Sequence, residues 1–372
     1  MTQRIGLFLP KLSLYGGVER FSWDMAKALT EAGYDVDFVC ARQEVEPPQG
    51  VNVIELGRPG PFKLIKMAWF LRSAEKARQQ GEYDLSVGLG KSLNHELLRI
   101  GGGPLRNFWQ LSQLAWPPGP ARSWKMLRRR LSPDNRLTLW IEPRQLRQAK
   151  MVVAVSHLVR DWLLAAYPWL DPAKVRVIYN RPDPARFEPP SPDERAAERE
   201  RLGLADSDSA LLFAGANFRL KNLAGTIRAL PLLPEEFVLL VAGGRRQGAY
   251  LKLAQDLGVA SRVRFLGRID HMPALYGACD VFALPTFYDA CSNAVLEALA
   301  CGVNAVSTQH NGSSFFLPKE HVLADPNDIP VLAQCIERAA SSPAPCPAWS
   351  EDVACGMPAY LDAVRGLLDA AS

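Results

Sequence analysis

The sequence predicts an α/β protein made of two doubly wound domains, each built on a parallel sheet. Short apolar runs alternate with helical patterns, which is typical of parallel strands joined by covering helices. This alternation pauses once, in a Pro-rich and charged stretch at 180–203, and then begins again. The chain has 372 residues, which is more than one typical domain core holds, so two domains are expected.

The strands are predicted from their apolar runs and the helices from apolar residues at helical spacing. In the first half a helix at 18–32 ends at Gly33, and in the second half helices cover 222–230 and 248–257. The predicted strands are 4–10, 35–41, 51–56, 83–90 and 151–156, and then 210–216, 237–244, 263–267, 281–285 and 304–308.

The stretch 180–203 is interpreted as the hinge region because it shows no apolar period. The expected division is an N-terminal Rossmann-like domain at 1–180, a C-terminal one at 181–350, and a final helix within 351–372. Whether this helix crosses back to the N-terminal domain is left open. Two doubly wound sheets that face each other would bind a ligand between them, at the carboxyl ends of their strands.

Composition and charge exclude several classes of protein. The net charge of +4 is too small to indicate a nucleic-acid partner. The seven cysteines are an odd number without a CxxC pair, and no signal-peptide pattern opens the chain. No apolar run reaches the ~18 residues that a membrane span needs. These features predict a reduced, cytoplasmic protein.

Two loops that follow predicted strands carry features of phosphate binding. Gly16 and Gly17 would let the backbone approach an anion, although the GxGxxG dinucleotide pattern is absent. Arg219 and Lys221 stand two positions apart just before a predicted helix, which suits a diphosphate. The alternatives are a tight turn for the glycines and a solvated loop for the two cations.

The stretch FYDACSNAVLEALACG places Asp289 eight positions before Glu297, at the start of a helix-forming run. Ser292 and Asn293 are residue types that cap helix N-termini, where backbone N–H groups point at a ligand. Apolar residues at helical spacing would bury one face of this helix. The alternative is an ordinary amphipathic helix with two exposed carboxylates.

No metal site is predicted. The Asp pairs 35/37 and 206/208 lack a third ligand at suitable spacing, and oxygen-rich sites need several. The five histidines show no i, i+4 pair, and no GxSxG motif supports hydrolase chemistry.

The segment 121–150 holds nine Lys or Arg against two acids, a local excess of +7. Cationic amphipathic helices with interfacial Trp favour anionic lipid surfaces, whereas the alternative is a basic helix packed on the first domain. The expected membrane-contact residues are Trp124, Lys125, Arg128, Arg129 and Arg130.

The order of these motifs resembles glycosyltransferase family 4, whose members are retaining enzymes of the GT-B fold. That order is a glycine loop after the first strand, Arg-x-Lys after the first strand of the second half, and acid-x7-Glu before a helix. The segments FAGANFRLKNL and FYDACSNAVLEALACG are most similar to those of lipopolysaccharide core transferases of the glucosyltransferase I type. The resemblance covers nearly the whole chain and is strongest over 211–312.

The resemblance assigns roles to residues by position. Arg219 and Lys221 match the catalytic pair that neutralises the donor diphosphate. Asp289 matches the acid that holds the transferred sugar, and Glu297 matches the acid that accepts hydrogen bonds from the ribose hydroxyls. The remaining matches are Cys291, Ser292 and Asn293 at the sugar, Arg268 and Ile269 at the base, and Gly16 and Gly17 at the phosphates and acceptor.

Some positions depart from the family pattern. The first acid is usually Glu, which is one methylene longer than Asp289. Gly102 and Leu105 stand where similar proteins have an Asp or His that faces the reacting sugar. Asn304 replaces the Pro of a CGxP turn, and Phe315 stands where an acid is common.

The sequence therefore predicts a retaining, metal-independent glycosyltransferase without a cofactor. It would move a hexose from a nucleotide sugar, taken as UDP-linked, to a lipopolysaccharide-core or other lipid-linked acceptor. Its place would be peripheral, at the inner face of the cytoplasmic membrane. The alternatives are a soluble transferase acting on sugars or sugar phosphates, and a non-catalytic nucleotide-sugar-binding protein, which Gly102 would favour.

Overall fold

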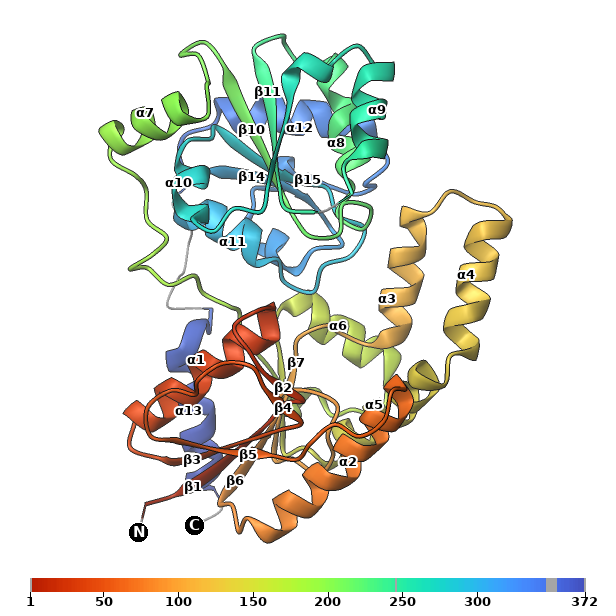
Figure 1. Cartoon of the computed structure of the whole chain (residues 1–372), viewed down its shortest axis with the longest axis vertical. Helices are drawn as coiled ribbons and strands as arrows, with labels where there is room; N and C mark the ends of the chain where they lie inside the picture. Colours follow the sequence, from red (N-terminus) through yellow and green to blue (C-terminus); the bar gives the residue numbers. More distant parts are fainter. Residues whose placement is uncertain (1, 245, 346–352, 371–372) are drawn as a thin grey trace. The chain divides into compact units, whose positions relative to one another are not determined.

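The computed structural model describes residues 2–244, 246–345 and 353–370, which divide into two compact units. The N-terminal unit comprises Met1–Gln110, Pro117–Tyr179 and Glu351–Ser372, and the C-terminal unit comprises Leu111–Trp116 and Asn180–Ser350. In each unit helices cover a main parallel sheet (Figure 1). The expected boundary at 350–351 lies outside the described residues.

The sheet of the N-terminal unit has seven strands, and all neighbours in it are parallel. The strands are β1 (Arg4–Phe8), β3 (Asp35–Cys40), β5 (Val51–Glu55), β6 (Leu85–Gly88), β7 (Leu97–Ile100), β8 (Met151–Ala154) and β9 (Val175–Val177). Their order is β5-β3-β1-β6-β7-β8-β9, so the direction of winding reverses between β1 and β6. A separate short pair joins β2 (Lys11–Leu12) to β4 (Arg42–Gln43).

The helices of this unit include one from the end of the chain. They are α1 (Gly17–Glu31), α2 (Lys63–Gln80), α3 (Leu105–Ser112), α4 (Pro120–Leu131), α5 (Pro133–Gln148), α6 (His157–Ala166) and α13 (Gly356–Asp369). The last residues of α3 fall in the C-terminal unit. On α13, Ala363 and Val364 are fully buried in the same core as Leu29 of α1. The C-terminal helix therefore completes the core of the N-terminal unit.

The sheet of the C-terminal unit has six parallel strands in the order β12-β11-β10-β13-β14-β15. They are β10 (Ser209–Ala214), β11 (Phe237–Ala242), β12 (Val263–Gly267), β13 (Val281–Leu284), β14 (Asn304–Thr308) and β15 (Val322–Leu323). The helices are α7 (Pro192–Arg201), α8 (Leu223–Ala229), α9 (Gly248–Asp256), α10 (Met272–Gly277), α11 (Asn293–Ala300) and α12 (Ile329–Ser341). Here the winding reverses between β10 and β13.

All ten predicted strands are confirmed, and the structure adds short ones that were not predicted. The added strands of the main sheets are β7, β9 and β15, with four, three and two residues. Such short strands carry too few residues for an alternating or continuous apolar pattern to stand out.

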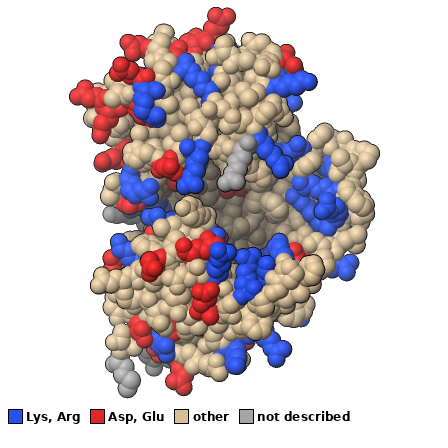
Figure 2. Space-filling model, in the orientation of Figure 1, with Lys and Arg blue, Asp and Glu red and all other residues tan. Residues whose placement is uncertain are grey.

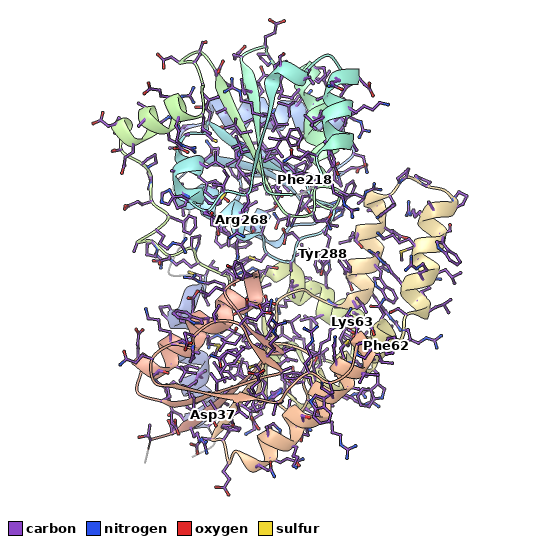
Figure 3. All side chains as sticks on the ribbon, viewed as in Figure 1. Asp37, Phe62, Lys63, Phe218, Arg268 and Tyr288 are labelled. Carbon is purple, nitrogen blue, oxygen red and sulfur yellow. The ribbon has the colours of Figure 1, made fainter. Side chains whose placement is uncertain are left out.

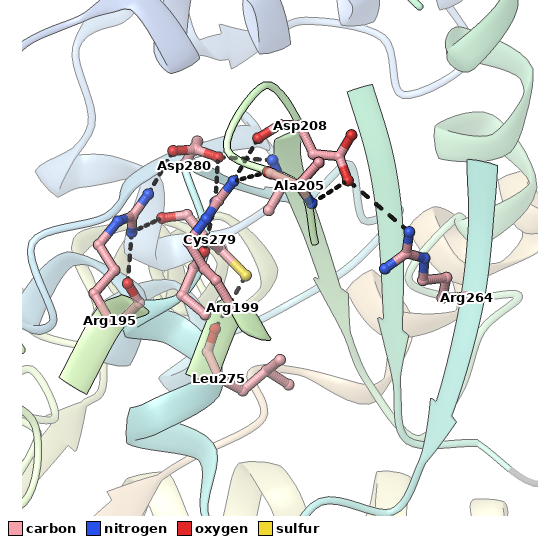
Figure 4. A network of polar contacts seen from close by, with 11 residues as sticks. Arg195, Arg199, Ala205, Asp208, Arg264, Leu275, Cys279 and Asp280 are labelled. Atoms are coloured by element: carbon pink, nitrogen blue, oxygen red, sulfur yellow. Dashed lines mark hydrogen bonds and ion pairs between the residues drawn. The ribbon is translucent and has the colours of Figure 1, made fainter. Parts of the chain in front are cut away.

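The stretch 180–203, interpreted as the hinge region, contains in its second half a helix that was not predicted. Ser191 and Glu194 form a capping box that starts α7, with Pro at the first helical position. The helix buries no residue, and arginines on it donate instead to carbonyl groups and to Asp280 of the C-terminal unit (Figure 4). Because ion pairs rather than an apolar stripe hold α7, its sequence shows no apolar period.

Asp37, labelled in Figure 3, belongs to the Asp pair 35/37 and is buried. Its carboxylate accepts hydrogen bonds from Arg4 Nη2 at 2.9 Å, Asn52 Nδ2 at 2.8 Å and the Tyr83 hydroxyl at 2.8 Å. The three donors compensate for the burial of the charge, and they assign Asp37 to a structural cluster.

Candidate active site

Two loops of the C-terminal unit meet where its sheet reverses direction. The loop 215–222 follows β10 and the loop 285–292 follows the neighbouring strand β13. The carbonyl of Leu220 accepts hydrogen bonds from the Phe287 N–H group at 3.0 Å and from the Thr286 hydroxyl at 3.1 Å. In doubly wound sheets a ligand binds at this switch point, outside the carboxyl ends of the strands.

The cations and the first acid of the predicted site lie on these two loops. The Lys221 ammonium forms an ion pair with the Asp289 carboxylate, and the two side chains are only 19% and 16% exposed. Arg219 is exposed, and its guanidinium carbon lies 4.0 Å from the ring centroid of Trp116, a residue of the same unit. The structure therefore brings Lys221 and Asp289 together.

The cation-bearing loop is anchored by Phe218, which lies between Arg219 and the strand. Phe218 is buried and packs edge-on against Tyr250, with ring centroids 5.4 Å apart (Figure 3). At the end of the loop Asn222 takes a left-handed conformation and caps α8 through the Gly225 N–H group, 3.1 Å away.

The acid-bearing loop is fixed through its backbone. The Asp289 N–H group donates to the His310 carbonyl at 2.9 Å, and the Asp289 carbonyl accepts from the Gly312 N–H group at 3.0 Å. Asn293, further along, accepts a hydrogen bond on its side-chain oxygen from Asn180 Nδ2 at 2.8 Å. These bonds hold the Asp289 backbone and tie the start of α11 to the residue that opens the linker.

Asn311 is a residue of this site that sequence analysis missed. Its side-chain oxygen accepts from the Ser292 N–H group at 3.2 Å and from the Ser313 N–H group at 3.1 Å. Its amide nitrogen donates to the Ser307 hydroxyl at 2.9 Å. The side chain is buried, so it determines the path of the loop that carries Asp289. The only local signal was an Asn-Gly turn after a strand.

Cys291 and Ser292, expected at the donor sugar, lie in this loop. Cys291 is half-buried, and its sulfur is 3.5 Å from the Ser313 hydroxyl. Ser292 occupies the N-cap position of α11, but its hydroxyl makes no cap hydrogen bond. Its carbonyl instead accepts from the Ser313 hydroxyl at 2.9 Å.

Glu297 lies on α11, where the fully buried Val295 and Leu296 fix the helix. The hydroxyl of the buried Tyr276 donates to Glu297 Oε2 at 3.0 Å. Burial raises the pKa of Glu297, while the Tyr276 hydrogen bond and the positive charge of Arg186 oppose that rise. Glu297 is therefore a partly buried carboxyl group with a defined orientation.

The residues expected at the base are less constrained. Arg268 follows β12 and pairs with Asp270 at 2.9 Å, but the two side chains are 74% and 83% exposed (Figure 3). Ile269 packs against the core of the unit. The prediction that their backbone contacts a base stays a prediction.

The glycine loop of the N-terminal unit comes after β1 and the short strand β2, on the β1 side of the reversal between β1 and β6. Gly16 has φ +117°, which only glycine adopts readily, and a Cβ there would collide with the Glu19 carboxylate. The helix α1 begins at Gly17, and Glu19 lies in its first turn. This acid offsets part of the positive potential that the helix terminus offers to an anion.

The loop after β6, across the same reversal point, holds charged and polar groups that sequence analysis missed. The Lys91 ammonium donates to the Thr138 hydroxyl at 2.6 Å, and burial lowers the pKa of Lys91. His95 lies between two serine hydroxyls, 3.1 Å from Ser86 Oγ and 2.8 Å from Ser92 Oγ. Burial lowers the pKa of His95 to about 3, so this imidazole is neutral at physiological pH.

Two departures from the family pattern have different structural settings. A Cβ at Gly102 would meet no atom within 4 Å, so packing does not require glycine there. Asn304, in place of the turn Pro, donates from Nδ2 to the Ser342 carbonyl at 3.0 Å and the Pro343 carbonyl at 2.9 Å. This side chain ties the start of β14 to the end of α12.

The basic segment forms α4 and α5, which differ in burial. No residue of α4 is buried, and Trp124 is 62% exposed. Figure 2 shows Lys and Arg side chains gathered on the part of the molecule that α3 and α4 form. Arg128 and Arg130 are exposed, whereas Lys125 is half-buried and Arg129 lies over the Phe108 ring, 5.2 Å from its centroid. Arg129 therefore has a packing role within the unit.

The start of α2 adds exposed aromatic residues that sequence analysis missed. Phe62 is 67% exposed and Trp69 is 43% exposed. Beside Phe62, the Lys63 ammonium lies 3.5 Å from Asp134 Oδ2 at the start of α5 (Figure 3). The N-terminal unit thus exposes large apolar side chains at α2 as well as at α4.

Two doubly wound units, each with loops at the point where its sheet reverses direction, define the GT-B fold class. Comparison with known proteins agrees. Residues 16–181 match the model of a glycosyl transferase 4-like domain, and residues 208–342 match that of glycosyl transferases group 1. The chain belongs to glycosyltransferase family 4 and is a glycosyltransferase.

Relatives of this chain include a D-inositol 3-phosphate glycosyltransferase from Salinispora arenicola, 28% identical over 87% of this chain and 79% of the relative. The lipopolysaccharide glucosyltransferase WaaG of Escherichia coli is 27% identical over 43% of this chain and 45% of its own. The lipopolysaccharide core biosynthesis glycosyltransferase LpsE of Rhizobium meliloti is 30% identical over 38% of this chain and 43% of its own length.

Solved structures confirm the GT-B fold. A crystal structure of WaaG, a glycosyltransferase involved in lipopolysaccharide biosynthesis, superposes with a TM-score of 0.75 at 19% identity, covering 99% of this chain and 95% of that one. HepE of Anabaena, solved with UDP and glucose, superposes with a TM-score of 0.70 at 18% identity, covering 99% of this chain and 100% of that one. Among the helices that the structure describes, none has the length and apolar character needed to cross a membrane.

Proposed function

We propose that this glycosyltransferase is a retaining, metal-independent enzyme that transfers a hexose from UDP-hexose to a lipopolysaccharide-core or other lipid-linked glycan acceptor. The observation that carries the donor half is the meeting of Lys221 and Asp289 at the β10/β13 reversal point. A cation and an acid held side by side can bind a diphosphate and the hydroxyls of the sugar attached to it.

The donor diphosphate would bind to Arg219 and Lys221. Both side chains are cationic, and they follow β10 at the edge where a doubly wound sheet binds ligands. As the bond between sugar and phosphate breaks, negative charge grows on the leaving diphosphate, and fixed cations stabilise that charge. These two residues would supply the stabilisation that other transferases obtain from a divalent metal ion.

The division of roles between the acids follows from their settings. Asp289 contacts Lys221, so with a diphosphate on Lys221 it would lie near the sugar, and its carboxylate would accept hydrogen bonds from the sugar hydroxyls. Glu297 lies on α11 beside Tyr276 and would accept from the ribose hydroxyls. UDP with glucose, as held by HepE of the same fold, is the donor class proposed here.

The lipid-linked acceptor is proposed from the exposed surface of α4. Trp124, Leu127 and Leu131 are 62%, 45% and 55% exposed, and Arg128 and Arg130 are exposed beside them. Apolar side chains with flanking cations are the arrangement that binds an anionic bilayer surface. The enzyme would act there as a peripheral protein. Its relatives WaaG and LpsE, named as lipopolysaccharide and lipopolysaccharide core glycosyltransferases, support this class of acceptor.

A second candidate is a transferase that acts on a small phosphorylated acceptor away from membranes. The D-inositol 3-phosphate glycosyltransferase relative favours it, because that similarity covers 87% of this chain. Incubation of the enzyme with UDP-hexoses and either acceptor class, with and without EDTA, separates the two. Transfer to a lipid-linked glycan that survives EDTA, with the product anomer matching the donor in NMR, supports the first proposal. Transfer to sugar phosphates alone contradicts it.

A further inference from the structure

Tyr276 is a fully buried tyrosine whose ring is fixed by its neighbours. It lies on α10, and its ring centroid is 5.8 Å from that of Phe282 and 6.5 Å from that of Phe187. The exposed fraction of Tyr276 is 0%. Because aromatic neighbours prevent the ring from turning away, its hydroxyl stays 3.0 Å from Glu297 Oε2.

The Glu297 carboxylate has few other partners. Within the described ranges, Tyr276 is the only residue that donates a hydrogen bond to this side chain. The charged or titratable groups that face it are Arg186 from the linker, Cys301 beyond the end of α11, and Tyr276 itself. Burial raises the pKa of the Cys301 thiol to about 12, so this group is neutral and Arg186 is the only charge among the three.

We infer that Tyr276 is a positioning residue for donor binding, which holds one oxygen of Glu297 so that the other can accept from a ribose. The inference rests on the proposed role of Glu297. An unheld carboxylate could rotate about its last torsion angle, which has a broad energy minimum, and its oxygens would meet the two ribose hydroxyls less often. The hydroxyl of Tyr276 removes that freedom at no cost to the ligand.

The same hydrogen bond favours the ionised form of Glu297. A hydrogen bond donated to a carboxylate lowers its pKa, whereas burial raises it. The ionised form accepts more hydrogen bonds than the protonated form does. Removal of the Tyr276 hydroxyl would therefore raise the pKa of Glu297, and loss of nucleotide affinity on acidification would begin at a higher pH.

The test compares Tyr276→Phe with Tyr360→Phe by calorimetric titration from pH 5 to pH 8. The probe is whichever of UDP, GDP and ADP binds the wild-type chain most tightly. Tyr360 is a matched control because it is also buried and its hydroxyl accepts a hydrogen bond from Arg99 at 2.9 Å, within the N-terminal unit. Thermal unfolding of both variants separates a loss of stability from a loss of binding.

Tyr276→Phe is expected to raise the nucleotide Kd about three- to tenfold near pH 7. It should also raise the pH at which nucleotide affinity begins to fall on acidification. Tyr360→Phe is expected to leave both unchanged. In a Glu297→Gln background, Tyr276→Phe should add little further loss, because the carboxylate it positions is gone. The inference is overturned if Tyr276→Phe changes neither the Kd nor the pH at which affinity falls, or if the two losses are fully additive in the double variant.

Failure of the proposed function gives a different result. If Glu297→Gln leaves nucleotide affinity unchanged, the ribose role of Glu297 is wrong and the inference fails with it. If Glu297→Gln weakens binding while Tyr276→Phe does not, only the role of Tyr276 is wrong. If none of the three nucleotides binds the wild-type chain, the donor class itself is overturned.

Discussion

The Lys221 ammonium and the Asp289 carboxylate form an ion pair that joins the loops after β10 and β13. Each residue is also a proposed ligand for a different part of the donor. A diphosphate that binds Lys221 would compete with Asp289 for the same charge. Substitution of one partner should therefore change how the other binds the donor.

The first prediction concerns the two cations. Arg219→Ala and Lys221→Ala should each weaken binding of UDP by about ten- to hundredfold, because each removes a charge-assisted hydrogen bond of roughly 1.5–3 kcal/mol. Arg228→Ala, which removes an exposed charge on α8, should have no such effect. Isothermal titration measures the affinities. Unchanged affinity for every nucleoside diphosphate in both variants would contradict the phosphate role.

Lys221→Ala should cost more than Arg219→Ala, because it also leaves Asp289 facing the phosphates without a cation. Adding Asp289→Asn to Lys221→Ala should then restore part of the UDP affinity. A double variant that binds UDP no more tightly than Lys221→Ala alone would show that the unpaired Asp289 does not oppose binding.

The second prediction separates the two acids. Glu297→Gln should weaken binding of UDP itself, since this residue is proposed to hold the ribose. Asp289→Asn should leave UDP affinity unchanged or slightly higher, because Lys221 loses a competing anion, but it should lower turnover of the UDP-sugar. Binding of UDP and steady-state turnover are measured on both variants. Equal loss of UDP affinity in both would rule out this division of roles.

The third prediction concerns pH and His95. Burial lowers the pKa of His95 to about 3 from a reference near 6.5, so the unfolded chain binds a proton at this site more readily than the folded chain does. The stabilisation is complete above the unfolded pKa and is lost as the pH falls towards the folded one. From this group alone, the free energy of unfolding should drop by about 2 kcal/mol between pH 7 and pH 5.

Urea unfolding at several pH values measures this slope, and His95→Gln provides the comparison. The variant should be less stable at pH 7, because it loses the His95 ring, whose centroid lies 4.6 Å from that of Phe8. Its free energy of unfolding should fall less on acidification than that of the wild type. A variant with the same pH slope as the wild type would exclude a buried neutral imidazole.

The fourth prediction concerns the helix in the linker. Arg199 on α7 is 12% exposed and donates to the carboxylate of Asp280 and to the carbonyl groups of Ala278, Ala205 and Asp208 (Figure 4). Arg199→Ala removes these four contacts, although Asp280 keeps its hydrogen bonds from Arg195 and the Ala210 N–H group. The loss should lower the free energy of unfolding by about 2–4 kcal/mol. Urea denaturation measures the loss.

Arg201→Ala is the matched control, since Arg201 is on the same helix, is 61% exposed and pairs with Glu198 at i, i+3 spacing. Its loss should stay within about 0.5 kcal/mol. Similar losses for both arginines would mean that the contacts of α7 with Asp280 do not stabilise the unit.

The fifth prediction concerns the membrane surface. Arg128→Ala/Arg130→Ala should reduce binding to anionic vesicles by about thirtyfold, since each exposed cation contributes about 1 kcal/mol near such a surface. Arg129 is left intact because it packs over Phe108. The control Arg228→Ala/Lys252→Ala removes two exposed charges from the C-terminal unit and should not change binding.

Trp124→Ala tests the apolar part of that surface. It should weaken vesicle binding even at high salt, where charge is screened, and should leave the melting temperature unchanged because the side chain is 62% exposed. Vesicle sedimentation and thermal unfolding on the same variants measure both. A lower melting temperature with unchanged vesicle binding would favour a basic helix that packs for stability.

The sequence by itself determined the two parallel-sheet units and the donor motifs. Strands such as 210–216 and 237–244 are continuous apolar runs because a parallel sheet is buried on both faces, so they are visible locally. Arg219, Lys221 and Asp289 were found because they stand in loops between a predicted strand and a predicted helix, and Glu297 because it follows Asp289 by eight positions. The order of those motifs along the chain indicated the glycosyltransferase family.

Only the tertiary structure decided which partners those residues have. Asn311 and Tyr276 fix the two acids from segments that are 22 and 21 positions away in the chain, and their residue types carry no chemical motif. The helix α7 was missed because ion pairs hold it, and pairing across 81 positions leaves no local period. Burial and long-range pairing depend on how the chain returns upon itself, which spacing along the sequence does not record.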